Sequence, residues 1–196
     1  MKPLSTTTGA SGHVLRFLVL AWALLAGLAS AGECFAQADA QAEYRVKAAF
    51  LYKFGSYIEW PEQAFARADS PLVIGVLGAD GLADELAQIA GGHTVNGRPV
   101  TVRKLRRQDA LAGVNILFVG RAESSRLADI LAGVRGQPLL VVTEFEDARP
   151  HGAAINFVVV DDKVRFDVDL ESADQSGIKI SSRLLTVARK VLTRSS

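Results

Sequence analysis

Apolar residues recur at two different spacings along this chain. Short, wholly apolar or alternating runs predict strands over 71–78, 98–105, 114–120 and 138–145. Three-and-four spacing predicts helices over 81–90, over 122–134, and from Ser181 or Ser182 as N-cap to Leu192. This alternation of strands and helices predicts an α/β fold, a layered and largely parallel sheet flanked by helices.

The pattern changes to consecutive strands near the C-terminus. Residues 155–160 and 163–170 flank Asp161-Asp162 and predict an antiparallel hairpin. The second strand sends apolar residues to one face and acids to the other, namely Phe166 and Val168 against Asp167 and Asp169. We therefore expect the two acids to project side by side from the sheet.

The stretch "VKAAFLYKFGSYIEWP" (46–61) predicts an amphipathic helix laid on the sheet. Its charged residues exclude a membrane span, and Pro61 ends the helix because the residue before a proline is driven toward extended geometry. Phe50 and Phe54 lie on the apolar stripe and are expected in the core. Tyr52 and Trp60 lie off it and are candidates for a ligand or groove surface, while residues 62–70 are expected to form a linker.

The N-terminus has the layout of a secretory signal peptide. A positively charged start precedes an apolar run over 17–28 that is too short to cross a bilayer, and small-residue sites follow. Cleavage after Ala38 would remove residues 1–38 and leave one domain over 39–196. Glu33, in place of a small residue before Cys34, argues against a lipid anchor.

Charge and cysteine content exclude some classes of partner and crosslink. The formal net charge is +1, and removal of 1–38 brings it to zero because Lys2, Arg16 and Glu33 leave. A neutral chain has no overall attraction to nucleic acid or anionic membrane. Cys34 is the only cysteine and precedes the expected cut, so the exported domain is expected to be free of disulfides.

The motifs for catalysis or cofactor binding are weak. Gly75, Gly78 and Gly81 follow a strand, but their spacing fits neither a dinucleotide fingerprint nor a P-loop, and turn glycines are expected. His93 and His151 lie far apart, with no acid or second histidine at ligand spacing. We expect no catalytic residue, no cofactor and no metal, and hence no enzyme.

Two blocks carry a resemblance to a known family. "VKAAFLYKFGSYIEWP" and "INFVVVDDKVRFDVDLESADQSGIKISS" resemble the opening and closing blocks of the YfiR family, and the similarity extends from Tyr44 to Leu192. Lys53 stands where asparagine is usual in that family. The resemblance implies an α/β fold like that of periplasmic binding proteins.

The resemblance also implies a function and partners. It implies an exported periplasmic regulator that binds the periplasmic sensor domain of an inner-membrane signalling protein. That partner would be a diguanylate cyclase, whose repression lowers cyclic di-GMP and biofilm formation. An outer-membrane lipoprotein as second partner and a homodimeric state are implied as well.

Two hypotheses about the binding surface follow. For a protein-binding regulator, we expect the partner surface on the C-terminal hairpin, with exposed apolar residues beside paired acids: Ile155, Phe157, Asp167 and Asp169. The alternative is a small-ligand-binding module, whose pocket would combine Tyr52, Trp60 and the turn Gly75–Gly81.

Overall fold

The computed structural model describes residues 39–145 and 152–193. The chain divides into two units, 1–41 and 42–196, and the sheet with its helices belongs to the second. The expected signal peptide, its cleavage site, Cys34 and His151 lie outside the described residues. Within the described ranges, no helix is both long and apolar enough to cross a membrane.

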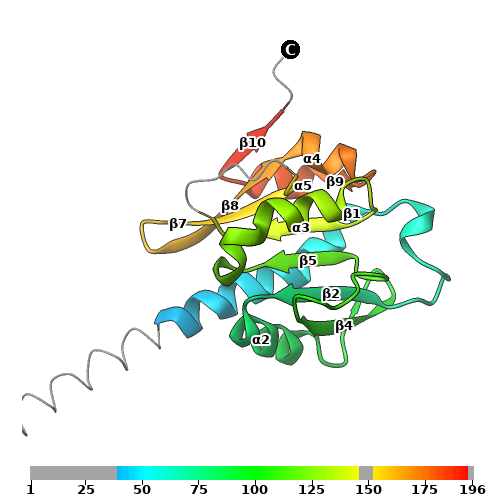
Figure 1. The fold of residues 1–196 in the computed structure, drawn as a ribbon, viewed down its shortest axis with the longest axis horizontal. Helices are drawn as coiled ribbons and strands as arrows, with labels where there is room; N and C mark the ends of the chain where they lie inside the picture. Colours follow the sequence, from blue (N-terminus) through cyan, green and yellow to red (C-terminus); the bar gives the residue numbers. More distant parts are fainter. Residues whose placement is uncertain (1–38, 146–151, 194–196) are drawn as a thin grey trace, which may run out of the picture. The chain divides into compact units, whose positions relative to one another are not determined.

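The second unit contains a mixture of short helices and strands (Figure 1). We call the helical residues 39–54 the opening helix. The other helices are η1 (Gly55–Tyr57), η2 (Glu62–Ala64), α2 (Asp80–Ala90), η3 (Arg121–Arg126), α3 (Leu127–Val134), α4 (Leu170–Gln175) and α5 (Ser182–Val187). The strands are β1 (Ile58–Glu59), β2 (Leu72–Leu77), β3 (Thr94–Val95), β4 (Arg98–Leu105), β5 (Ile116–Val119), β6 (Leu140–Thr143), β7 (Ile155–Val160), β8 (Lys163–Asp169), β9 (Lys179–Ile180) and β10 (Lys190–Leu192).

An eight-stranded sheet has the order β10-β8-β7-β6-β5-β2-β4-β3. Strands β7, β6, β5, β2 and β4 are parallel to one another, and β10 is parallel to β8. The β7–β8 hairpin and the β3–β4 pair are antiparallel, and β1 and β9 form a separate two-stranded sheet. The α/β layered fold, its largely parallel sheet and the C-terminal antiparallel hairpin are thereby confirmed.

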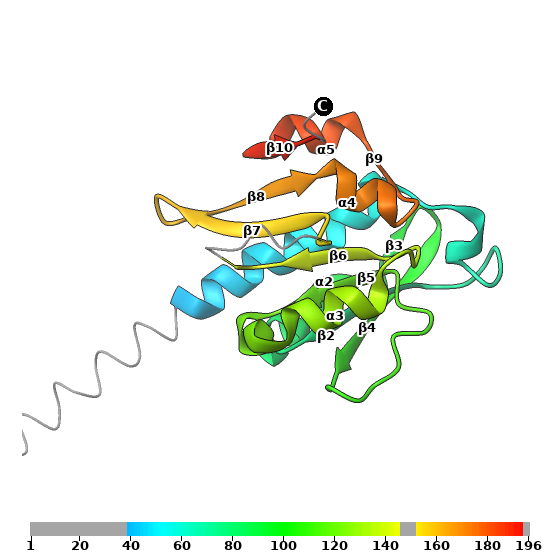
Figure 2. The same ribbon diagram turned by 45° about the horizontal axis from the view of Figure 1, so that its top comes forward.

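Helices cover the sheet on both faces. The opening helix and α2 pack on the face that carries Ile74, Ile116 and Phe118, whereas α3 packs on the face that carries Leu117 and Val119 (Figure 2). Because α2 follows β2 and α3 follows β5, the winding direction reverses between these two strands. Such a switch point leaves a crevice at the carboxyl ends of the strands in doubly wound sheets.

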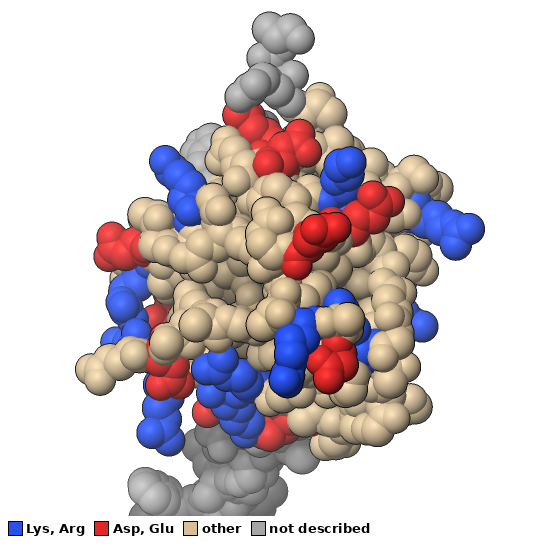
Figure 3. Space-filling model, turned by 90° about the vertical axis from the view of Figure 1, so that its right-hand side faces the viewer, with Lys and Arg blue, Asp and Glu red and all other residues tan. Residues whose placement is uncertain are grey.

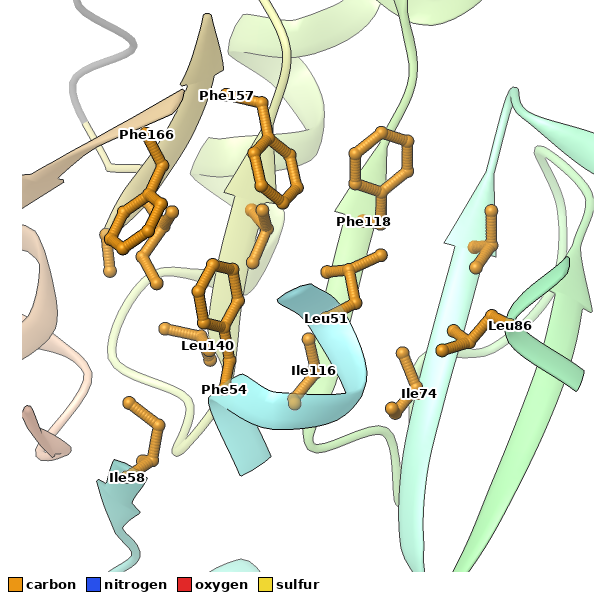
Figure 4. Close-up of a cluster of buried hydrophobic side chains, with 14 of the residues drawn as sticks. Leu51, Phe54, Ile58, Ile74, Leu86, Ile116, Phe118, Leu140, Phe157 and Phe166 are labelled. Atoms are coloured by element: carbon orange, nitrogen blue, oxygen red, sulfur yellow. The ribbon is translucent and has the colours of Figure 1, made fainter. Parts of the chain in front are cut away.

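Aromatic rings join the opening helix to the C-terminal hairpin (Figure 4). Phe54 is fully buried, and its ring centroid lies 5.7 Å from that of Phe157 and 5.2 Å from that of Phe166. Phe50 lies one turn earlier, half-buried, with centroid distances of 6.0 Å to Phe157 and 5.4 Å to Phe166. The expected placement of both phenylalanines on the core side is therefore confirmed.

Two predicted helix ends are wrong. The opening helix ends at residue 54, well before Pro61, and η1 and β1 follow it. A Cβ on Gly55 would approach Leu72 Cδ2 to 2.5 Å, so a side chain at this position would force Leu72 to move where the helix changes. The last helix ends at Val187, because the chain then pairs with β8 as β10.

We expect Phe54→Ala to lower the free energy of unfolding by about 3–5 kcal/mol, since it empties a fully packed aromatic site. Tyr52→Ala is the control on the same helix, and its loss should be less than half as large because that side chain is half-buried. Urea denaturation of both variants measures the difference. Equal losses would contradict this assignment of the helix face.

Candidate functional site

The crevice at the switch point is closed by backbone and side chains. Gly78 directly follows β2 and has φ +73°, and a Cβ on Gly120 would lie 2.5 Å from the Gly78 carbonyl oxygen. The side chain of Glu123 stands beside Gly78, since a Cβ there would be 2.9 Å from Glu123 Cγ. Glycine at 78 and 120 thus allows the two strand ends to approach closely, with no phosphate-sized space between them. Of the three glycines expected in a turn, only Gly78 lies in one, because Gly75 is inside β2 and Gly81 is in the first turn of α2.

Four charged side chains form a cluster at the same sheet edge, which we call the Lys47 cluster: Glu43, Lys47, Arg121 and Glu144. Lys47 is only 1 % exposed and forms ion pairs with Glu43 and with Glu144, itself buried. The backbone N–H of Arg121 also donates to Glu144, at 2.9 Å. A buried ammonium is tolerable only when paired and hydrogen-bonded in this way.

Tyr44 lies at the same sheet edge as the Lys47 cluster, on the side of α2. A Cβ on Gly81, in the first turn of α2, would be 3.2 Å from the Tyr44 ring. Burial raises the pKa of the Tyr44 phenol, Glu144 and Glu43 raise it further, and Arg121 opposes them. The opening helix therefore supplies the groups that occupy the position where doubly wound sheets bind ligands.

The pocket expected from Tyr52, Trp60 and Gly75–Gly81 is not assembled. Gly78 lies at the carboxyl end of β2, whereas Trp60 lies near the amino ends of β2 and β4. A six-residue strand separates these ends by roughly 20 Å. Tyr52 is at a third place, where its hydroxyl donates to the Thr94 carbonyl at 3.2 Å.

Trp60 instead lines a surface groove of about 630 Å³, the Trp60 groove, formed by residues 58–62, 65–68, 96 and 98. Its aromatic wall is the pair Trp60 and Phe65, whose ring centroids are 6.1 Å apart at an interplanar angle of 78°. The Arg98 guanidinium stacks on Phe65, 3.8 Å from the ring centroid. Tryptophan, phenylalanine and arginine in contact provide cation–π and stacking surfaces.

The segment 62–70 forms the groove wall rather than a plain linker. Arg98 Nη1 donates to the carbonyl of Ser70 at 2.8 Å, and Asn115 Nδ2 donates to the carbonyl of Ala64 at 2.9 Å. These bonds fasten the segment to β4 and to the start of β5. The pattern gave no sign of Phe65 or Arg98, because their meeting depends on strand pairing distant in sequence.

Trp60 also carries an unmet hydrogen-bonding group. Its indole Nε1 is buried and has no hydrogen-bond partner among the described residues. A buried donor without an acceptor costs about 1–3 kcal/mol. Figure 3 shows that acidic and basic side chains mix on this side of the molecule. At the groove itself, the lining includes Glu59 and Glu62 as well as Arg67 and Arg98.

The apolar residues expected in the docking site are buried. Ile155 is 0 % and Phe157 is 1 % exposed, so the expectation of exposed apolar side chains at these positions is wrong. Both point to the face covered by the opening helix, where Phe157 also lies 6.3 Å from Phe118. Although its sequence is apolar on both faces, β7 therefore has one face in the core.

The two acids of the hairpin have different structural partners. Asp167 accepts a hydrogen bond from Arg189 Nε at 2.8 Å and forms an ion pair with the same guanidinium, which raises the pKa of Arg189. Asp169 caps α4 by accepting from the backbone N–H groups of Glu171 and Ser172 at 3.0 and 3.2 Å. The structure therefore does not show them as a free pair of carboxylates.

In the described part of the chain, no group of three or more His, Cys, Asp or Glu side chains has the geometry to hold a metal ion. His93 lies in the turn before β3, with its ring 6.4 Å from that of Tyr52.

The expected cap at Ser181 is confirmed, since its hydroxyl accepts from the Arg183 N–H at 3.3 Å.

We expect Lys47→Met to lower the free energy of unfolding by about 3–5 kcal/mol, because it leaves the Glu144 carboxylate buried without its cation. Adding Glu144→Gln should restore part of the loss. Lys104→Met removes an exposed pair with Asp84 and should leave Tm almost unchanged. A double variant no more stable than Lys47→Met would show that the buried charge is not the cause.

Comparison with protein families matches residues 44–189 to the family described as YfiR/HmsC-like. The matched range begins at Tyr44 beside the Lys47 cluster and ends at Arg189, the partner of Asp167. It therefore includes residues 44–54 of the opening helix, the Trp60 groove and the C-terminal hairpin. With more than half of its length matched, the chain belongs to the YfiR/HmsC-like family.

Proposed function

We propose that this chain is an exported periplasmic regulator that binds the periplasmic sensor domain of an inner-membrane signalling protein. The partner is a diguanylate cyclase, which the chain represses, and repression lowers cyclic di-GMP and biofilm formation. The observation that carries the proposal is the family match over residues 44–189. An outer-membrane lipoprotein that sequesters the chain, and a homodimeric state, belong to the same proposal.

The chain acts in this proposal by binding and catalyses no reaction. Repression then requires that it bind the inactive state of the cyclase more tightly than the active state. A tenfold shift between the two states needs about 1.4 kcal/mol of differential binding free energy. Apolar contact at the interface is needed for affinity, because the balanced charge gives no general attraction to the partner.

We expect a deletion of the gene to raise cyclic di-GMP, and expression of the full chain to restore the lower level. The matched control is residues 39–196 preceded by methionine, which lacks the expected signal peptide and stays in the cytoplasm. If repression occurs across the periplasm, this control leaves cyclic di-GMP high. Equal repression by both forms would contradict the periplasmic site of action, and no effect of either would contradict the function.

Small-ligand binding in the Trp60 groove is a second candidate function, favoured by a groove of about 630 Å³ with the aromatic walls Trp60 and Phe65. Trp60 is the only tryptophan in residues 39–196, so its fluorescence reports on this groove alone. We expect a small-molecule extract of the periplasm to shift the emission, and Phe65→Ala, which removes one groove wall, to weaken the shift. An unchanged emission spectrum at saturating extract would count against this candidate.

A further inference from the structure

The β7–β8 hairpin extends past its neighbouring strands. Pairing of β6 with β7 ends at Thr143↔Asn156, and β10 pairs with β8 only from Asp167 onward. We call residues 157–166 the hairpin arm; Figure 1 shows it projecting beyond the rest of the sheet. Among the described residues, the arm has no strand beside either of its outer edges.

The turn determines which backbone groups the arm presents. Asp161 and Asp162 have φ values of 49° and 55°, as in a two-residue type I′ turn. The pair Val160↔Lys163 that flanks such a turn is hydrogen-bonded, so the next pair, Val159↔Val164, is not. The N–H and C=O of Val159 therefore point away from β8, toward the open edge of β7.

The arm also exposes apolar side chains. Val159 and Val160 are 39 % and 37 % exposed and, as neighbours in a strand, point to opposite faces. Val46 on the opening helix is 43 % exposed and lies one turn before Phe50, whose ring contacts Phe157. Exposed valines thus lie on both of the elements that pack together through Phe50 and Phe157.

The open edge of β7 lacks the residues that normally protect a sheet edge. Natural edges carry charged residues or proline, which discourage pairing with another chain. The part of β4 that extends past its short pair with β3 carries Arg103 and Lys104, and Lys190 lies on β10. The opposite edge of the arm carries Lys163 and Arg165 on β8. Residues 157–160, in contrast, read Phe-Val-Val-Val.

We propose that the open edge of β7 binds an extended segment of the membrane partner as an added antiparallel strand, an inference that rests on the proposed function. Backbone hydrogen bonds to Val159 and apolar contacts with Val159 and Val160 would hold the segment. The carboxylates of Asp161 and Asp162 at the tip favour a partner segment that contains a lysine or arginine. A second copy pairing through the same edge brings Phe-Val-Val-Val and no such cation, so the occupant is the partner.

The test compares Val159→Pro, which removes the outward N–H, with Val159→Thr, which keeps it. The Val159 N–H makes no bond to β8, so both variants should keep the parent Tm. The probe is right-side-out inner-membrane vesicles that contain the cyclase and present its periplasmic domain, and binding of the full mature chain is measured by sedimentation. We expect about a tenfold weaker affinity for Val159→Pro and a change below about threefold for Val159→Thr.

Amide hydrogen exchange on the parent gives a second measurement, in which vesicles should slow exchange at Val159. If Val159→Pro binds like the parent, or if exchange at Val159 stays fast in the complex, the strand-addition site is wrong while the proposed function stands. If the parent shows no saturable binding to vesicles, the proposed function and this inference both fail. Loss of binding by both variants would point to side-chain contact only and would also overturn strand addition.

Discussion

The structure depends on the packing of the opening helix across one face of the sheet. Leu51 and Phe54 are fully buried there, against strands that come from both halves of the chain. Burial of side chains of this size stabilises the fold by about 1.5–3 kcal/mol each. Without this helix the apolar face of β5, β6 and β7 would be open to water. The hairpin is held on the sheet by the same contacts, because Phe157 and Phe166 pack on Phe54.

The same helix decides which sheet edge is available for binding. At the carboxyl ends of the parallel strands, Tyr44 and the Lys47 cluster occupy the switch point, so the position used by many doubly wound sheets is filled by the chain itself. At the amino ends, the chain continues through β1 into the Trp60 groove, which is open to solvent. Compared with apolar side chains of similar volume, a buried lysine between two carboxylates contributes little net stability. It does determine which side chain faces that sheet edge.

Local patterns predicted the elements whose own residues carry a clear apolar or turn pattern. The strands around 72–77, 98–105 and 155–160 were found because their apolar runs and turn residues are local signals. Long-range contacts decided what was missed. The last helix stops at Val187 since the next residues gain a strand partner in β8, and the N–H of Arg189 donates to the Phe166 carbonyl at 2.8 Å. The short pair β1–β9 likewise depends on residues more than a hundred positions apart.

The same distinction between local patterns and long-range contacts applies to the candidate sites. Alternation correctly separated Phe166 from Asp167, but it could not show that Asp167 has Arg189 as a partner. Nor could it show that Ile155 faces a helix more than ninety positions earlier in the sequence. Trp60 was singled out because it lies off the apolar stripe, and it does line a groove. Its neighbour Phe65 comes from a segment whose sequence predicts a linker, and Arg98 comes from the start of a strand. Neither sequence pattern predicts a binding site.

The Trp60 groove and the hairpin arm both adjoin the opening helix. Trp60 follows η1 and β1 directly after the opening helix, and Phe50 of that helix contacts Phe157 at the base of the arm. A ligand in the groove and a strand on the arm would therefore both bind to parts of the chain that adjoin this helix. If a ligand strengthens partner binding tenfold, the partner must strengthen ligand binding tenfold, because the coupling free energy is shared. The Lys47 cluster opposes any shift of the helix along the sheet, since a shift would separate buried charges. Coupling between the two surfaces thus requires a rearrangement of that cluster or a movement confined to residues 55–60, after the helix has ended.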